Sequence, residues 1–181
     1  MQFPVRARSI LLLALTCALT LSMSVTVAGE ATSRPTTWSS KPAGVRLDLP
    51  RAWSMQSQPG IAPLILREAS GRAMMGIMVE RLPEKDATAA LEALTDRSLA
   101  AHRHSISRFK LLSRQDIEVA GTPATEIYFR GKRSGETYKW IQTLFVSRKH
   151  KVYVLYSAPT NLYLRYLGDY DQLVRSIRLL P

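Results

Sequence analysis

The stretch "GTPATEIYFRGKRSGETYKWIQTLFVSRKHKVYVLYSAP", residues 121–159, decides the fold. It contains three runs of alternating side chains, separated by short turns at "RSGE" and "RKHK". Alternation with period two is typical of β-strands, and the short connections predict an antiparallel meander. Both faces of the runs are largely apolar in the middle, so we expect other parts of the chain to cover the meander on both sides.

Working outward, the preceding residues predict further strands at "GVRLDLP", "WSMQS", "PLILREAS", "AMMGIMVERL" and "LLSRQDIEV". Two segments change to helical spacing. Residues 87–107 are rich in Ala and Leu, with Asp86 as the expected N-cap. Apolar residues also recur at intervals of three and four between Tyr163 and Ile177, after Thr160 as a cap. The order of these elements predicts an α+β domain built on an antiparallel sheet.

The first residues have the layout of a secretory signal. Arg6 and Arg8 precede the uncharged apolar run Ile10–Leu21, and small residues follow it, so we expect residues 1–28 to be a cleaved signal peptide. An uncleaved membrane anchor stays an alternative, because residues 10–28 are just long enough to span a bilayer. Cys17 is the single cysteine of the chain. In a lipoprotein Cys17 would be the acylated residue, but Thr16 fits poorly at the preceding position, where a small Gly, Ala or Ser is usual.

Cleavage would leave a protein without cysteine, and therefore without disulfides or thiolate metal sites. Residues 29–42 are rich in Ser, Thr and Pro and are expected to form a flexible lead, and residues 43–181 to form a single domain. The formal charge of +11 becomes +9 when the two arginines of the signal are removed. A basic protein favours acidic partners, such as an acidic protein surface or anionic lipid headgroups.

Several motifs resemble the PsbP/Mog-like superfamily, which includes small exported bacterial proteins of the DcrB type. They are "LP" followed by "W" at residues 49–53, "GTPA" at 121–124, "YVLYSAP" at 153–159 and the closing "SIRL" at 176–179. The resemblance covers about residues 43–181. It implies an α/β/α sandwich, in which an antiparallel sheet of about six to seven strands carries helices on both faces. It also implies a binding, assembly or accessory protein, and it assigns no binding residue.

The residues show no catalytic or metal-binding pattern. Nucleophile and metalloprotease motifs are missing, as are phosphate-binding glycine loops. His102 and His104 would lie about 200° apart on a helix and could not share an ion there. Met74 and Met78 are better explained as packing residues than as copper ligands. We therefore expect a protein that is not an enzyme and that uses no cofactor or metal.

Two groups of residues are candidates for binding. The turns of the meander carry cations that could contact an anionic partner, namely Lys132, Arg133, Arg148, Lys149 and Lys151. Successive turns of a meander lie at opposite ends, so these cations cannot form one continuous stripe, and nucleic acid is not expected as a partner. Four tyrosines could line a pocket between the last helix and the sheet: Tyr153, Tyr156, Tyr163 and Tyr166.

The resulting hypothesis is a non-enzymatic accessory protein, exported to the periplasm or the cell envelope, that acts by contact with an envelope protein. Two alternatives stay open at this point. One is a domain that binds a small molecule or a lipid in the tyrosine pocket. The other is an envelope protein that keeps its N-terminal segment as a membrane anchor.

Overall fold

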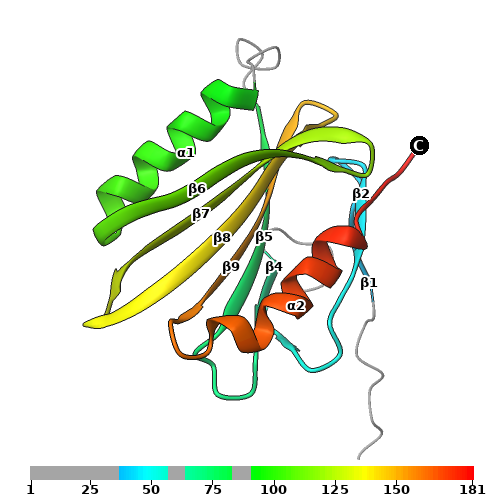
Figure 1. Cartoon of the computed structure of the whole chain (residues 1–181). Helices are drawn as coiled ribbons and strands as arrows, with labels where there is room; N and C mark the ends of the chain where they lie inside the picture. Colours follow the sequence, from blue (N-terminus) through cyan, green and yellow to red (C-terminus); the bar gives the residue numbers. More distant parts are fainter. Residues whose placement is uncertain (1–36, 57–63, 83–90) are drawn as a thin grey trace, which may run out of the picture. The chain divides into compact units, whose positions relative to one another are not determined.

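The computed structural model describes residues 37–56, 64–82 and 91–181, all within one compact unit, Arg34–Pro181 (Figure 1). The expected signal peptide, residues 29–36 of the lead and the Asp86 cap lie outside the described residues. The elements, in chain order, are β1 (Thr37–Ser40), β2 (Val45–Asp48), β3 (Ser54–Met55), β4 (Leu64–Arg67), β5 (Met74–Arg81), α1 (Leu91–Ser105), β6 (Ser107–Val119), β7 (Thr122–Arg133), β8 (Glu136–Ser147), β9 (His150–Pro159), α2 (Tyr163–Arg175) and β10 (Arg178–Leu179).

Within the described residues, seven strands form an antiparallel sheet in the order β3-β4-β5-β9-β8-β7-β6. The predicted meander is confirmed as β7, β8 and β9. Tyr128 pairs with Ile141, and Ile141 pairs with Tyr156. The two turns of the meander each have two central residues with positive φ, as in the mirror-image turns that match the twist of a hairpin.

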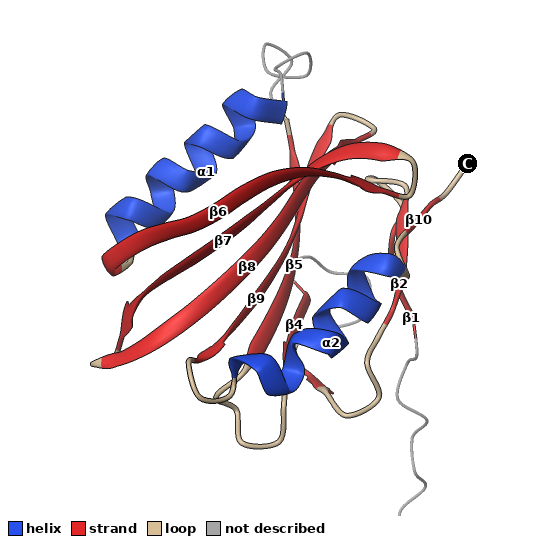
Figure 2. Ribbon diagram, viewed as in Figure 1, coloured by secondary structure: helices blue, strands red, loops and turns tan. Residues whose placement is uncertain are grey.

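Strand β8 shows how the two faces of the sheet are covered. Trp140 and Leu144 pack in clusters with Leu99 and Leu94 of α1. Phe145 belongs instead to the cluster that contains the buried residues of α2, and Thr143 is hydrogen-bonded to Tyr170 of α2. Successive residues of a strand point to opposite faces, so α1 and α2 cover opposite faces of the sheet (Figure 2). The expected α+β architecture, a sheet with helices on both faces, is confirmed.

The expected flexible lead needs a correction. Residues 37–40 form strand β1, which pairs with β2 and so belongs to the folded unit. The physical reason is Trp38, which is only 3% exposed and packs in the core with Val45 and Leu47. Strand β10 pairs with the other edge of β2, giving a second sheet in the order β1-β2-β10.

Strand β6 begins at Ser107, earlier than expected, and forms one edge of the large sheet. Its pairing with β7 is interrupted twice, between Ser107 and Lys110 and between Leu111 and Ser113. Arg108, inside the first interruption, has a φ of 54°. Each interruption is a β-bulge, which bends the strand and increases its twist.

Candidate functional site

The cations at the turns of the meander lie at opposite ends of β8, as expected. Lys132 and Arg133 end β7, and the guanidinium of Arg133 lies 5.7 Å from the ring centre of Tyr138. Arg148 and Lys149 form the turn between β8 and β9. The two pairs therefore contribute to different surfaces.

Arg148 connects three parts of the chain. Its guanidinium donates to the carbonyl oxygens of Leu180, at 2.8 Å, and of Pro181. It also donates to the carbonyl oxygen of Lys41, at 3.5 Å. The side chain lies flat against Gly44, where a Cβ atom would come within 2.5 Å of its Nε. Arg148 thus holds the C-terminal residues and the β1–β2 turn against the large sheet.

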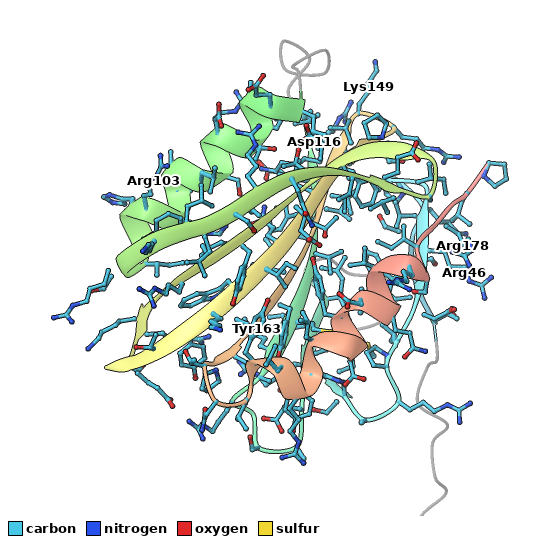
Figure 3. The ribbon with its side chains drawn as sticks, viewed as in Figure 1. Arg46, Arg103, Asp116, Lys149, Tyr163 and Arg178 are labelled. Carbon is cyan, nitrogen blue, oxygen red and sulfur yellow. The ribbon has the colours of Figure 1, made fainter. Side chains whose placement is uncertain are left out.

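These contacts gather five exposed cations, which we call the basic end: Lys41, Arg46, Arg148, Lys149 and Arg178. Arg46 and Arg178 stand directly opposite each other in the β2–β10 pair (Figure 3). Among the described residues, none of the five is ion-paired with an acidic side chain. Like charges placed opposite each other repel. An anion bound at this surface would reduce that repulsion.

Lys41, Arg46 and Arg178 were not among the candidates from sequence. The pairing of β2 with β10 brings them close to Arg148 and Lys149, and no local sequence pattern predicts that pairing. Lys151, which was a candidate, is already engaged. Its Nζ lies 2.6 Å from Oε2 of Glu80 and 5.4 Å from the ring centre of Tyr153.

The four candidate pocket tyrosines do not lie together, which corrects that expectation. Tyr153 points to the face covered by α1, where it packs beside Leu82 and Leu94. The other three are in the core under α2. Strand alternation separates them, because Tyr153 and Tyr156 are an odd number of residues apart.

The tyrosines under α2 pack against one another. The rings of Tyr156 and Tyr163 are 5.1 Å apart, and Tyr166 meets Trp53 edge-on at 5.6 Å. Tyr156 donates a hydrogen bond of 2.8 Å to the carbonyl oxygen of Tyr163. Burial raises the pKa values of both Tyr156 and Tyr163, which keeps their hydroxyl groups neutral. These contacts are those of a packed aromatic core.

On the other face, a buried polar group lies beneath α1. The side chain of Gln142, in β8, is fully buried. Its Oε1 accepts from Nε2 of His102 at 2.6 Å, and its Nε2 donates to Oγ of Ser98 at 3.0 Å. The His102 ring stacks on Phe129 at 4.7 Å. Burial lowers the pKa of His102, although the bond to Gln142 opposes this, so the imidazole is held neutral.

Among the described residues, no group of three or more His, Cys, Asp or Glu side chains is placed to hold a metal ion. The two helices that the structure describes, α1 and α2, both fall short of the length and apolar character needed to cross a bilayer.

Comparison with protein-family models and with curated proteins finds no match. Comparison with solved structures does. The chain is similar to the cyanobacterial PsbP protein, CyanoP, from Synechocystis sp. PCC 6803, with a TM-score of 0.60 and 10% identity over 79% of this chain and 91% of that one. It is also similar to PA94 from Pseudomonas aeruginosa, a protein of unknown function and putative regulator, with a TM-score of 0.57 and 21% identity over 81% and 96%.

At these identities the likeness concerns the fold alone. The described unit has a PsbP-like fold, as the sequence resemblance predicted.

Proposed function

We propose that this protein is a non-enzymatic accessory protein of the cell envelope, exported through its N-terminal segment, that binds an acidic protein through the basic end. The observation that carries the proposal is the basic end itself. Five exposed cations from three separate parts of the chain converge there, with no acidic side chain of the described residues paired to them. Such a surface attracts acidic partners and speeds their association.

Two further observations support the proposal. Residues 1–28 have the layout of a secretory signal. The fold is shared with a cyanobacterial PsbP protein and with a putative regulator from Pseudomonas aeruginosa. Function resides in sites rather than in folds, so the test addresses the basic end.

The test compares two triple variants with the same change in charge. The first, Lys41→Gln with Arg46→Gln and Lys149→Gln, removes three of the five cations of the basic end and leaves Arg178 and the structural Arg148 in place. The second, Lys110→Gln with Lys132→Gln and Arg133→Gln, removes three cations elsewhere on the sheet. Each full chain is produced in a bacterial host, cross-linked in the cell and precipitated with antibodies against the protein.

We expect about tenfold less cross-linked partner to be recovered with the first variant, because attractive contacts at the surface are removed. The second should keep the partner, and the partner of the unmodified protein should dissociate at high salt. Equal recovery with both variants would overturn the proposed contact. Sedimentation with phosphatidylglycerol vesicles, if it depended on the same three cations, would instead assign the basic end to an anionic lipid surface.

Export has a separate test. Mass spectrometry of the N-terminus in the envelope fraction should find a protein that begins near Gly29. An intact Met1 in the membrane fraction would replace export with anchoring, and an acylated N-terminal Cys17 would identify a lipoprotein.

A further inference from the structure

Three cations form a row across neighbouring strands of the large sheet. Lys110 of β6 pairs with Arg130 of β7, and Arg130 pairs with Lys139 of β8. Directly paired residues project from the same face of a sheet, and neighbouring strands lie about 4.8 Å apart. The three side chains therefore start within about 10 Å of one another, and we call them the cation row.

Packing identifies the face from which the cation row projects. Phe109 and Leu111 pack in the cluster under α1, and Lys110 lies between them in β6. Phe129, which precedes Arg130, packs in the same cluster. Successive strand residues point to opposite faces, so the row projects from the face that carries α2. There α2 lies over β8 and β9, while β6 and β7 extend beyond it (Figure 2), and Lys110 and Arg130 are exposed.

Lys139 is held in position where the cation row meets α2. Its Nζ lies 5.9 Å from the ring centre of Tyr128 and 5.6 Å from that of Tyr163, the first residue of α2. A cation over an aromatic face is attracted by the ring. The two rings therefore restrict the ammonium group of Lys139, which loses less freedom when an anion binds.

The cation row has no neutralising carboxylate within the part of the chain that the structure describes. No ion pair there includes a member of the row, and the first turn of α2 has no acidic side chain. Glu126, on the same face of β7, accepts hydrogen bonds from Gln115 at 2.7 Å and from Thr143 at 3.4 Å. Like charges directly opposite each other destabilise a sheet, and a bound anion would relieve this repulsion.

Exposed apolar side chains occur in the same segments as the cation row. The large hydrophobic residues that are exposed in the described ranges are Leu112, Leu164 and Leu179. Leu112 follows Lys110 by two residues, at the second bulge of β6. Leu164 is 77% exposed and follows Tyr163, whose ring contacts the row. Cations combined with exposed apolar side chains are typical of protein surfaces that lie in the interface of an anionic membrane.

We propose that the cation row and Leu164 dock this side of the folded unit on a membrane rich in anionic phospholipid. The three cations contact the lipid phosphates, and Leu164 enters the boundary between headgroups and acyl chains. The docking surface does not depend on the basic end. Arg148 lies about 30 Å from Lys139 along β8, which is several Debye lengths at physiological salt, so the basic end stays free for a protein partner.

The experiment measures co-sedimentation of the full chain, as the host cell processes it, with phosphatidylglycerol vesicles. Phosphatidylcholine vesicles are the neutral comparison. We expect binding to the anionic vesicles alone, and weaker binding at high salt. The row variant, Lys110→Gln with Arg130→Gln and Lys139→Gln, should bind about a hundredfold more weakly, because each cation near an anionic surface contributes about fivefold.

Two control variants match these changes. Lys41→Gln with Arg46→Gln and Lys149→Gln removes the same charge from the basic end and should bind within about threefold of the unmodified protein. Leu164→Ala should weaken binding about fivefold because less apolar surface enters the membrane, whereas Leu179→Ala, in β10, should leave it unchanged.

A further variant separates the charge of the row from its packing. Arg130→Lys keeps the charge of an exposed side chain and should bind like the unmodified protein. Equal loss of binding in the row variant and in the basic-end variant would overturn the inference, because net charge alone would then explain the attraction. Binding that the row variant leaves unchanged, or equal binding to the two kinds of vesicle, would overturn it as well.

Discussion

Glu68, in the turn between β4 and β5, keeps a negative charge at a position that is only 5% exposed. Its carboxylate accepts hydrogen bonds from the backbone N–H groups of Ser70, Arg72 and Ala73, and from the Ser70 hydroxyl. Burial by itself would raise the pKa of Glu68. The hydrogen bonds outweigh it and lower that pKa to about 2. The carboxylate therefore stabilises the turn most strongly while it is ionised.

Replacing Glu68 with Gln should lower the free energy of unfolding by about 1–3 kcal/mol at pH 7, because several backbone donors lose a charged acceptor. The folded-state pKa lies below the unfolded one, near 4.5, so the contribution of Glu68 is complete above pH 4.5. It is lost as the pH falls from there toward 2. Urea unfolding between pH 7 and pH 2.5 should show this acid-dependent loss in the unmodified protein and a smaller loss in the variant.

Glu136→Gln is the matched control for this measurement. Glu136 forms an ion pair of 2.6 Å with Arg72, and both side chains are 44% exposed. An exposed pair of this kind contributes about 0–1 kcal/mol. If the two variants lost equal stability, the turn would not depend on the ionised Glu68.

Gly131, in β7, faces the connection between α1 and β6. A Cβ atom there would lie 2.3 Å from Cγ2 of Ile106 and 2.9 Å from the backbone oxygen of Ser107. Gly131→Ala should therefore destabilise the protein by about 1–3 kcal/mol through overpacking. Gly168→Ala, in α2, meets no atom within 4 Å and should stabilise the protein by about 0.5–1 kcal/mol. Thermal unfolding should show a lower melting temperature for Gly131→Ala and a higher one for Gly168→Ala, which would verify both statements.

At the scale of elements, the β8–β9 turn places two residues other than glycine at positive φ. Arg148 has a φ of 48° and Lys149 a φ of 60°. A left-handed conformation costs a residue with a side chain about 1–2 kcal/mol. Arg148 offsets this cost through its contacts with the C-terminal residues, whereas no hydrogen bond of the Lys149 side chain is found among the described residues.

Lys149→Gly should accordingly raise the free energy of unfolding by about 1 kcal/mol, because glycine adopts this conformation without strain. Arg148→Gly relieves the same strain but removes the bonds to Leu180 and Lys41, so it should be less stable than Lys149→Gly. Chemical denaturation would distinguish the two. A stabilising effect of Arg148→Gly as large as that of Lys149→Gly would show that the contacts of Arg148 contribute nothing.

The sequence predicts elements where the information is local. The meander follows from alternation and turn chemistry within residues 121–159, and α2 follows from its apolar spacing. Strand β1 was missed, because four residues in a Ser- and Thr-rich context carry only one strong signal, Trp38. Tyr153 was wrongly grouped with Tyr156, although the same alternation that predicts β9 places them on opposite faces.

The basic end and the contact between His102 and Gln142 could not be predicted, because both depend on long-range packing. Arg46 and Arg178 meet only through the pairing of β2 with β10. The sequence places His102 on a helix and indicates no partner for its side chain. Its contact with Gln142 depends on where α1 lies over β8, which the spacing of α1 does not specify.

For the whole folded unit, the two helices stabilise one sheet from opposite sides. The strands in the middle of the sheet contribute side chains to the core on both faces. On β9, Val154 and Tyr156 pack in the core under α2, while Leu155 packs with the cluster under α1. A strand shared in this way cannot open on one face without disturbing the other. We therefore expect the two sides of the sheet to unfold together.

Hydrogen exchange should reveal this arrangement. The amides of β8 and β9, which have a neighbouring strand on each side, should exchange most slowly and near the rate of global unfolding. Those of β3 and β10, which have two residues each, should exchange faster. Two separate sets of slow amides with different opening free energies, one for each face, would contradict a shared core.

The bulges of β6 affect whether the exposed edge of the large sheet can pair with another chain. A flat outer strand of this length would offer a row of unpaired backbone groups to any other extended chain, and so would template fibrils. The two interruptions break the continuous register that an incoming chain would need for pairing. Charged side chains along the strand also disfavour its approach; they are Arg108, Lys110, Asp116 and Glu118. We therefore expect this edge of the large sheet to resist the addition of further strands, even when many copies of the protein are crowded together.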